Sequence, residues 1–176
     1  MIRTTIYSIG LGTLVLGSGA VATSVKEPAL TPKFSHISSD TVKIAQSTIN
    51  TAAIEQSVFN QINNYRASKR LPALTRNSAI DNQARIHSQN MASGKVPFGH
   101  SGAQQRLKAI GITYKAAGEN VAYNQKYSDP ATQAVQGWLK SSGHLANIIG
   151  NYNLTGVGVA SNSKGQIYFT QIFLRT

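Results

Sequence analysis

Two histidines and a glutamate in the second half of the chain are the residues best suited to chemistry. Glu119 lies between Gly118 and Asn120 in an apolar stretch, where a charged group needs a partner. His100 and His144 each follow a glycine, which lets the backbone turn sharply and present the imidazole to a cleft. Neutral imidazoles and carboxylates are ligands for zinc and for other first-row metals. The two histidines are therefore candidate partners of Glu119, although residues 19 and 25 positions apart match no local metal-binding motif.

The same residues also have plainer interpretations. The two histidines could form hydrogen bonds within packed loops and bind nothing, and Glu119 could be a structural carboxylate that orients His144. If the site is catalytic, zinc on the two histidines would lower the pKa of a bound water toward ~7, and Glu119 would take its proton. Three further side chains are candidates for the lining of the cleft: Asn120, Ser141 and Tyr123.

The apolar pattern from Thr51 onward predicts four helices that must position these residues. Apolar side chains recur at helical spacing, with turn residues between the recurring stretches. Asp129 is expected to cap the last helix, with Pro130 at its first position and Gly143 as its terminator. His87 and Trp138 fall on apolar stripes and are assigned to buried positions. The predicted helices cover residues 54–69, 78–93, 103–110 and 130–142.

Extended segments are predicted in the second half of the domain. Residues 154–161 and 166–174 flank a turn at 162–165 and are expected to form a β-hairpin, and residues 116–123 are also extended. Helices followed by mixed elements and a hairpin indicate an α+β fold. In such a fold helices cover a small, mostly antiparallel sheet.

The N-terminal residues have the pattern of an export signal. Arg3 supplies the positive charge, residues 6–16 form a short apolar stretch, and Ala20-Val21-Ala22 gives the small-residue cleavage pattern. The alternative is an uncleaved anchor, although the apolar run is shorter than the ~20 residues that a membrane span needs. We therefore expect a signal peptide at 1–22, a flexible linker at 23–50 and one domain at 51–176. The mature protein is expected to be periplasmic or extracellular, without a transmembrane helix.

Composition excludes several classes of protein. The 176 residues contain no cysteine, which rules out a disulfide framework, a zinc–thiolate cluster and a thiol nucleophile. Seventeen Lys and Arg against six Asp and Glu give a net charge of +11. A basic exported domain suits an anionic cell-envelope polymer or lipid. Nucleic acid is not an expected partner, because no reading motif is present. The scattered basic residues, Arg66 and Arg106 among them, are predicted to form a solvated surface.

Four short motifs occur in a fixed order: FGHS at 98–101, AGENVA at 117–122, GWLKSSGH at 137–144 and GVGV at 156–159. Together they resemble the CAP superfamily (cysteine-rich secretory proteins, antigen 5 and pathogenesis-related proteins) in its cysteine-free bacterial form. The family's domain is also called the SCP domain, and the resemblance covers about residues 59–173. It implies a three-layer α-β-α sandwich with a small, mostly antiparallel sheet, and an extracellular location.

The resemblance also implies a cleft with two histidines and two glutamates. His100, His144 and Glu119 match three of the four, and Ser141 stands where many members have the second glutamate. The missing carboxylate favours binding over catalysis. The resulting hypothesis is an exported module that binds a divalent metal, or a small polar or lipidic ligand, at the cell envelope, without an organic cofactor. One alternative is a zinc-dependent hydrolase of peptide or cell-wall material. Another is a basic surface module that binds anionic polymer and has a vestigial cleft.

Overall fold

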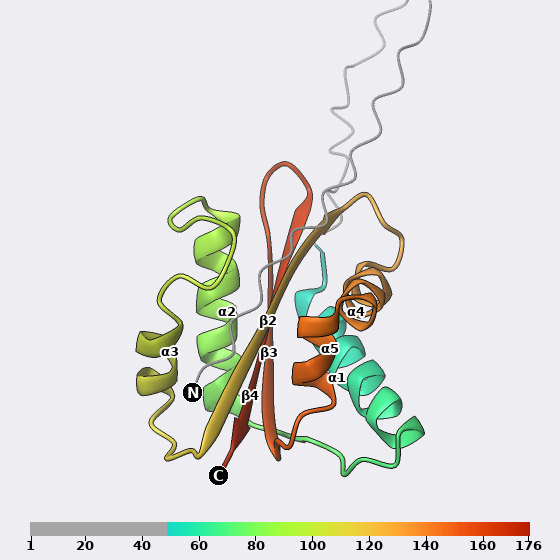
Figure 1. Ribbon diagram of the computed structural model, residues 1–176. Coiled ribbons are helices and arrows are strands. Elements are labelled where there is room, and N and C mark those ends of the chain that lie inside the picture. Colours follow the sequence, from blue (N-terminus) through green and yellow to red (C-terminus); the bar gives the residue numbers. More distant parts are fainter. Residues whose placement is uncertain (1–48) are drawn as a thin grey trace, which may run out of the picture. The chain divides into compact units, whose positions relative to one another are not determined.

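Residues 49–176 are described by the structure, a computed structural model in which five helices and four strands follow one another (Figure 1). Their bounds are α1 Thr51–Ser68, β1 Thr75–Arg76, α2 Ser78–Ala92, α3 Ala103–Ile110, β2 Ala116–Gln125, α4 Pro130–Lys140, α5 Ser142–Ile148, β3 Leu154–Ser161 and β4 Gln166–Arg175. The predicted export signal and nearly all of the predicted linker lie outside the described residues. Within residues 49–176, no helix is both long and apolar enough to cross a membrane.

The four strands form one sheet in the order β1-β3-β4-β2. β3 and β4 make the predicted antiparallel hairpin, and β2 runs antiparallel to β4 from Ala116 opposite Arg175 to Gln125 opposite Gln166. β1 adds only two residues, parallel to the start of β3. The sheet is therefore small and mostly antiparallel, as the sequence predicted.

Helices cover both faces of this sheet (Figure 1). On one face, α1, α4 and α5 enclose a core that includes Trp138, Phe169 and Phe173. On the other face, α2 and α3 pack Ile80 and Leu107 against Ile172 and Leu174 together with smaller residues. Buried residues in β4 alternate between these cores, as the two-residue period of a strand requires. The predicted α-β-α sandwich is confirmed.

The end of the fourth helix differs from the prediction. α4 begins at Pro130, with Asp129 Oδ1 accepting a hydrogen bond from Thr132 N at 3.0 Å, as expected for the cap. It stops at Lys140 because Ser141 adopts an extended backbone, and a separate helix then starts. Gly143 lies within that helix, α5, and does not terminate α4. A seven-residue helix gives too little periodic signal to be predicted.

The two glycines of the GVGV motif bring β3 against α2. A Cβ on Gly156 would collide with the backbone nitrogen of Asp81, and a Cβ on Gly158 would collide with that of Arg85. Both obstructing atoms belong to the helix backbone, which cannot turn aside as a flexible side chain would. Glycine is therefore required here by close approach and not by an unusual backbone angle.

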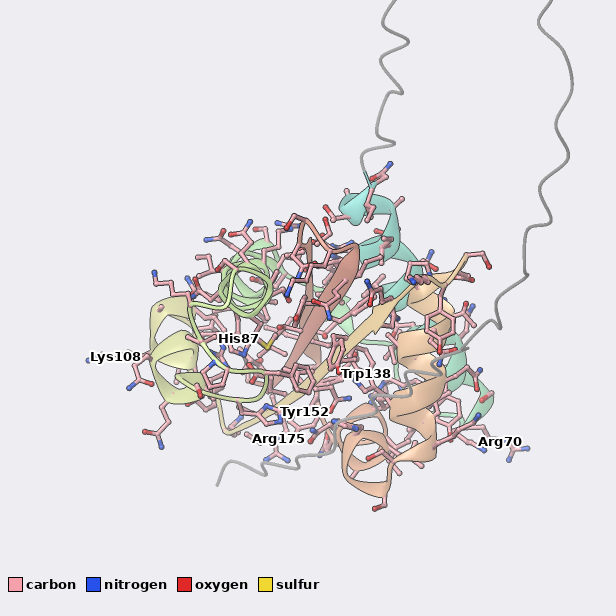
Figure 2. All side chains as sticks on the ribbon, turned by 90° about the horizontal axis from the view of Figure 1, so that it is seen from above. Arg70, His87, Lys108, Trp138, Tyr152 and Arg175 are labelled. Carbon is pink, nitrogen blue, oxygen red and sulfur yellow. The ribbon has the colours of Figure 1, made fainter. Side chains whose placement is uncertain are left out.

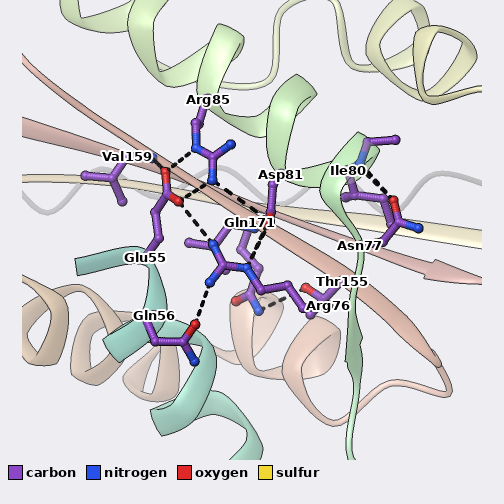
Figure 3. Close-up of polar contacts among 12 residues, drawn as sticks. Glu55, Gln56, Arg76, Asn77, Ile80, Asp81, Arg85, Thr155, Val159 and Gln171 are labelled. Atoms are coloured by element: carbon purple, nitrogen blue, oxygen red, sulfur yellow. Dashed lines mark hydrogen bonds and ion pairs between the residues drawn. The ribbon is translucent and has the colours of Figure 1, made fainter. Parts of the chain in front are cut away.

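A buried ionic cluster joins α1, α2 and the outer side of β3 (Figure 3). Glu55 accepts hydrogen bonds from Arg85 Nε at 2.7 Å and from Arg76 Nη2 at 3.0 Å, and both oxygens of Asp81 accept from Arg76 Nε. Each carboxylate also accepts a hydrogen bond from a β3 amide: Glu55 from Val159 N and Asp81 from Val157 N. These carboxylates accept hydrogen bonds from β3 amides that a neighbouring strand would otherwise accept.

Candidate functional site

Three elements far apart in the sequence contribute the predicted site. His100 lies in the loop before α3, Glu119 in β2 and His144 in α5. His100 Nδ1 lies 2.9 Å from Glu119 Oε1, and their side chains are only 8% and 10% exposed. The charge of His100 contributes to the lowered pKa of His144 after burial, which is the larger cause. The structure therefore places His100 and Glu119 in direct contact, while His144 contributes through its position in α5.

Arg106, in α3, pairs with Glu119. Its Nε donates to Oε2 at 3.0 Å and its Nη2 donates to Oε1 at 2.8 Å, so both carboxylate oxygens are engaged. Burial alone would raise the pKa of Glu119, but the hydrogen bonds from His100 and Arg106 and the charge of Arg106 lower it overall. Glu119 is therefore an ionised carboxylate held in a two-pronged pair. The assignment of Arg106 to a solvated surface was wrong.

His87, in α2, supports this pair. It is 1% exposed, and its Nε2 lies 2.7 Å from the carbonyl oxygen of Gly99. Its Nδ1 lies 3.0 Å from Arg106 Nη1. Because a guanidinium only donates, Nδ1 must accept and Nε2 must carry the proton. Burial, and then the charge of Arg106, lower the pKa of His87. The burial expected of His87 from its place on an apolar stripe is confirmed, and both of its ring nitrogens are hydrogen-bonded.

Together, His87 and Arg106 hold the loop that carries His100. His87 donates to Gly99 O on one side of His100, and Arg106 Nη1 donates to Ser101 O at 2.7 Å on the other. Both are positioning residues that the sequence analysis did not assign to the site. Seen from above the sheet, His87 and Trp138 lie on opposite sides of it (Figure 2). The Trp138 indole is buried and donates to Val121 O at 3.1 Å.

His144 is the exception to this pattern of satisfied groups. It is 4% exposed, yet neither ring nitrogen has a hydrogen-bond partner among the described residues. Burial and the charge of His100 lower the pKa of His144, so the ring is neutral near pH 7. A neutral imidazole presents one N–H and one lone pair. Buried groups of this kind are normally paired, so this ring calls for water, a ligand or an ion.

Two asparagines fasten α5, and so His144, to β2. Asn120 Nδ2 donates to His144 O at 3.2 Å, and Asn147 Nδ2 donates to Asn120 Oδ1 at 2.9 Å. A third link is Arg66, in α1, which is 2% exposed and donates to Ile148 O at 2.8 Å. The prediction of a solvated Arg66 was wrong, since its guanidinium lies among backbone carbonyls.

The three candidates for the cleft lining have different environments. Asn120 is fully buried and acts through the hydrogen bonds just described. Ser141 precedes α5, and its buried Oγ has no hydrogen-bond partner among the described residues. Tyr123 is half-buried and stacks on Tyr168, with ring centroids 5.6 Å apart. Ser141 is therefore a second side chain with an unpaired polar atom, next to the start of the helix that carries His144.

The donor set limits what metal could be held. Among residues 49–176, no group of three or more His, Cys, Asp and Glu side chains has the arrangement of a metal site. Arg106 engages both oxygens of Glu119, and one of them also lies beside His100 Nδ1. Two imidazoles, His144 and His100, remain as possible ligands, with Glu119 beside His100 Nδ1. A carboxylate in that position is typical of the support behind a ligating histidine.

Known proteins similar to this chain agree on the fold. The model of the cysteine-rich secretory protein family, CAP, matches residues 59–173. The uncharacterized protein YkwD of Bacillus subtilis is 33% identical over 157 residues, which are 86% of this chain and 56% of YkwD. This chain thus spans about half the length of that relative.

Two solved structures are also similar. One is an extracellular protein containing a SCP domain from Bacillus anthracis, with 28% identity and a TM-score of 0.60 over 72% of this chain and 41% of that one. The other is an outer surface protein from Borrelia burgdorferi, with 17% identity and a TM-score of 0.62 over 72% of this chain and 96% of that one. The similarity to the Borrelia burgdorferi protein shows only that the two chains share a fold. The four sequence motifs, the α-β-α sandwich and the match to the family model all indicate the same family. The chain belongs to the CAP family.

Proposed function

We propose that this CAP domain is an exported binding module rather than an enzyme, and that its ligand, a divalent metal or a small polar molecule, binds at His144 beside His100. The observation that carries the proposal is the buried His144 ring, whose two nitrogens have no partner among the described residues. Leaving a buried polar group unpaired costs about 1–3 kcal/mol, so a ligand that pairs with it gains affinity.

The state of Glu119 argues against hydrolysis. A general base must accept a proton from water, but both oxygens of Glu119 accept from Arg106, and one also lies beside His100 Nδ1. The lowered pKa of this carboxylate makes it a weak base. Ser141 stands where a second glutamate would be needed, and its Oγ has no activating partner in the described part of the chain. The residues at the site therefore fit binding better than catalysis.

Zinc is the metal that this donor set suits, although the set is incomplete. His144 and His100 would be its protein ligands, and water or a bound molecule would complete the coordination. The ion would act as a Lewis acid for oxygen or nitrogen ligands. Glu119 would orient His100 through Nδ1, and Arg106 would hold Glu119 in place.

The distribution of charge supports an anionic partner at the cell envelope. Of the four side-chain carboxylates in residues 51–176, Glu55, Asp81 and Glu119 are buried and paired with arginines, and only Asp129 is exposed. Lysines are exposed throughout the same part of the chain. The accessible surface is therefore more uniformly positive than the sequence count suggests. This observation also favours the second candidate function, salt-sensitive binding of anionic polymer.

Calorimetric titration of the metal-free protein with zinc tests the proposal. We expect about one site, abolished in His144→Ala and unchanged in His36→Ala, a control histidine that precedes the family match. Glu119→Gln should weaken binding by about 10–100-fold if Glu119 supports His100. Equal zinc binding by the His144→Ala variant would contradict the metal form of the proposal. If the unaltered protein cleaves labelled peptide or peptidoglycan and the Glu119→Gln variant does not, the hydrolase hypothesis would replace the binding proposal.

A further inference from the structure

A groove at the hairpin end of the sheet plays no part in the function proposed above. It has a volume of about 600 Å³ and lies between the last turn of α2 and the β3–β4 hairpin. The loop of the hairpin extends past the C-terminal end of α2 (Figure 1). Neither His100 nor His144 lines the groove. Its size is within the range of small-molecule sites.

An aromatic side chain forms the floor of this groove. Tyr168 lines it and stacks on Tyr123, with a centroid distance of 5.6 Å and an interplanar angle of 23°. Phe98 packs edge-on against Tyr123 at 5.1 Å, which fixes the pair. In the sheet, Tyr168 is flanked by Tyr123 in β2 and by Ala160 in β3. Ala160, the small neighbour of Tyr168 in β3, also lines the groove.

Neutral polar groups surround this ring. Asn162 Nδ2 donates to Gln166 Oε1 at 2.8 Å, which fixes the Gln166 amide at the rim. Gln166 Nε2 and the Gln89 amide make no hydrogen bond within the described part of the chain, and serines of the hairpin add hydroxyls. An aromatic face edged by amides and hydroxyls matches a sugar ring, which has an apolar C–H face and a hydroxyl rim.

Of the described residues that line the groove, Lys164 at the hairpin tip is the one with a charged side chain. No Asp or Glu is among the lining residues, and Lys164 forms no ion pair with any described residue. Burial, and then Tyr123, raise the pKa of Tyr168, so its hydroxyl stays protonated, and it donates to Gln166 Oε1 at 3.4 Å. Every titratable group in the groove is thus neutral or positive at pH 7.

We propose that this groove binds a short oligosaccharide that carries a carboxylate, with one sugar ring on Tyr168 and the carboxylate at Lys164. The aromatic floor supplies the contact area, the Gln166 and Gln89 amides pair with hydroxyls, and Lys164 selects the charged sugar. The site is independent of His144, so either proposal can fail alone.

Two carboxylated probes test the groove: trigalacturonate and the disaccharide of N-acetylglucosamine and N-acetylmuramic acid. Amide NMR spectra of the full chain, recorded at low salt, should shift at Gly94 and Ser163, on the two walls, with at least one probe. Tyr168→Ala should weaken that probe's binding about tenfold, which corresponds to ~1.4 kcal/mol. Gln166→Ala, which keeps the aromatic floor, should also weaken it. Lys164→Ala should weaken binding about three- to fivefold at low salt.

Matched controls separate the groove from the general positive charge of the domain. Tyr127→Ala and Lys140→Ala remove an exposed tyrosine and an exposed lysine elsewhere, and both should bind the probe as the unaltered chain does. The methyl ester of trigalacturonate should bind more weakly than the acid, and His144→Ala should leave probe binding intact. The proposal is overturned if neither probe shifts the groove amides at millimolar concentration, or if Tyr168→Ala and Gln166→Ala both bind normally. Equal affinity for acid and ester overturns the carboxylate assignment.

Discussion

Removing Arg106 should destabilise the domain strongly, because four contacts depend on its guanidinium. Arg106→Met leaves Glu119 buried without its cation and leaves Ser101 O and His87 Nδ1 without their donor. The Arg106 and Glu119 side chains are 9% and 10% exposed, so little solvent screens the pair. Breaking one partner of a buried ion pair costs about 3–5 kcal/mol, and we expect a loss in that range.

Urea unfolding followed by fluorescence measures this loss. Trp138 is the only tryptophan and is 1% exposed, so its emission reports unfolding of the core. Lys108→Met, on the exposed side of the same helix, is the control and should change the free energy of unfolding by less than about 0.5 kcal/mol. The double variant Arg106→Met/Glu119→Leu should lose less than the sum of the single losses, since neither charge is stranded. A loss below about 1 kcal/mol for Arg106→Met, or strict additivity, would refute this account of the pair.

Two site histidines, a glycine of β3 and the buried Arg66 give three further predictions. The pKa values of His87 and His144 are lowered, so their contribution to stability is complete above about pH 6.5 and is lost as the pH falls through the folded-state values. The melting temperature should therefore drop on acidification, and less steeply in His144→Gln; an identical slope would contradict the assignment. Gly158→Ala should cost at least about 3 kcal/mol in urea unfolding, because its Cβ would meet α2 backbone, and a neutral result would disprove the close approach. Arg66→Met should cost about 2–4 kcal/mol, with amide exchange fastest in α5, and unchanged exchange there would exclude its role as a fastener.

Much of the fold was predictable because its signals are local. The C-terminal hairpin, the helix at 103–110 and the Asp129–Pro130 helix start each follow from periodicity and turn chemistry within a few residues. β1 and α5 were missed since two paired residues and a seven-residue helix carry almost no periodic signal. Tertiary contacts, with β3 and with Arg66 respectively, hold these short elements.

The site was predictable only in part. Glu119 was noted because a charged group in an apolar stretch needs a partner, and His100 and His144 were noted because each follows a glycine. The resemblance to the CAP family then grouped the three as one candidate site. The arginine that pairs with Glu119 could not be predicted, because Arg106 looks like a surface cation in the sequence. One signal was available: the domain has few acids, and buried carboxylates require buried cations. Which arginine satisfies Glu119 depends on α3 crossing beside β2, and no local pattern encodes that crossing.

The central claim, that His144 is a neutral buried imidazole kept for a ligand, can be tested directly by ¹⁵N NMR of the histidine side chains. Addition of zinc to the metal-free protein should shift a ring nitrogen of His144 strongly. His87 should keep its Nε2–H form, since both its nitrogens are already engaged. If the His144 nitrogens stay unchanged at saturating zinc and show a fixed protein partner, the metal site proposed here does not exist.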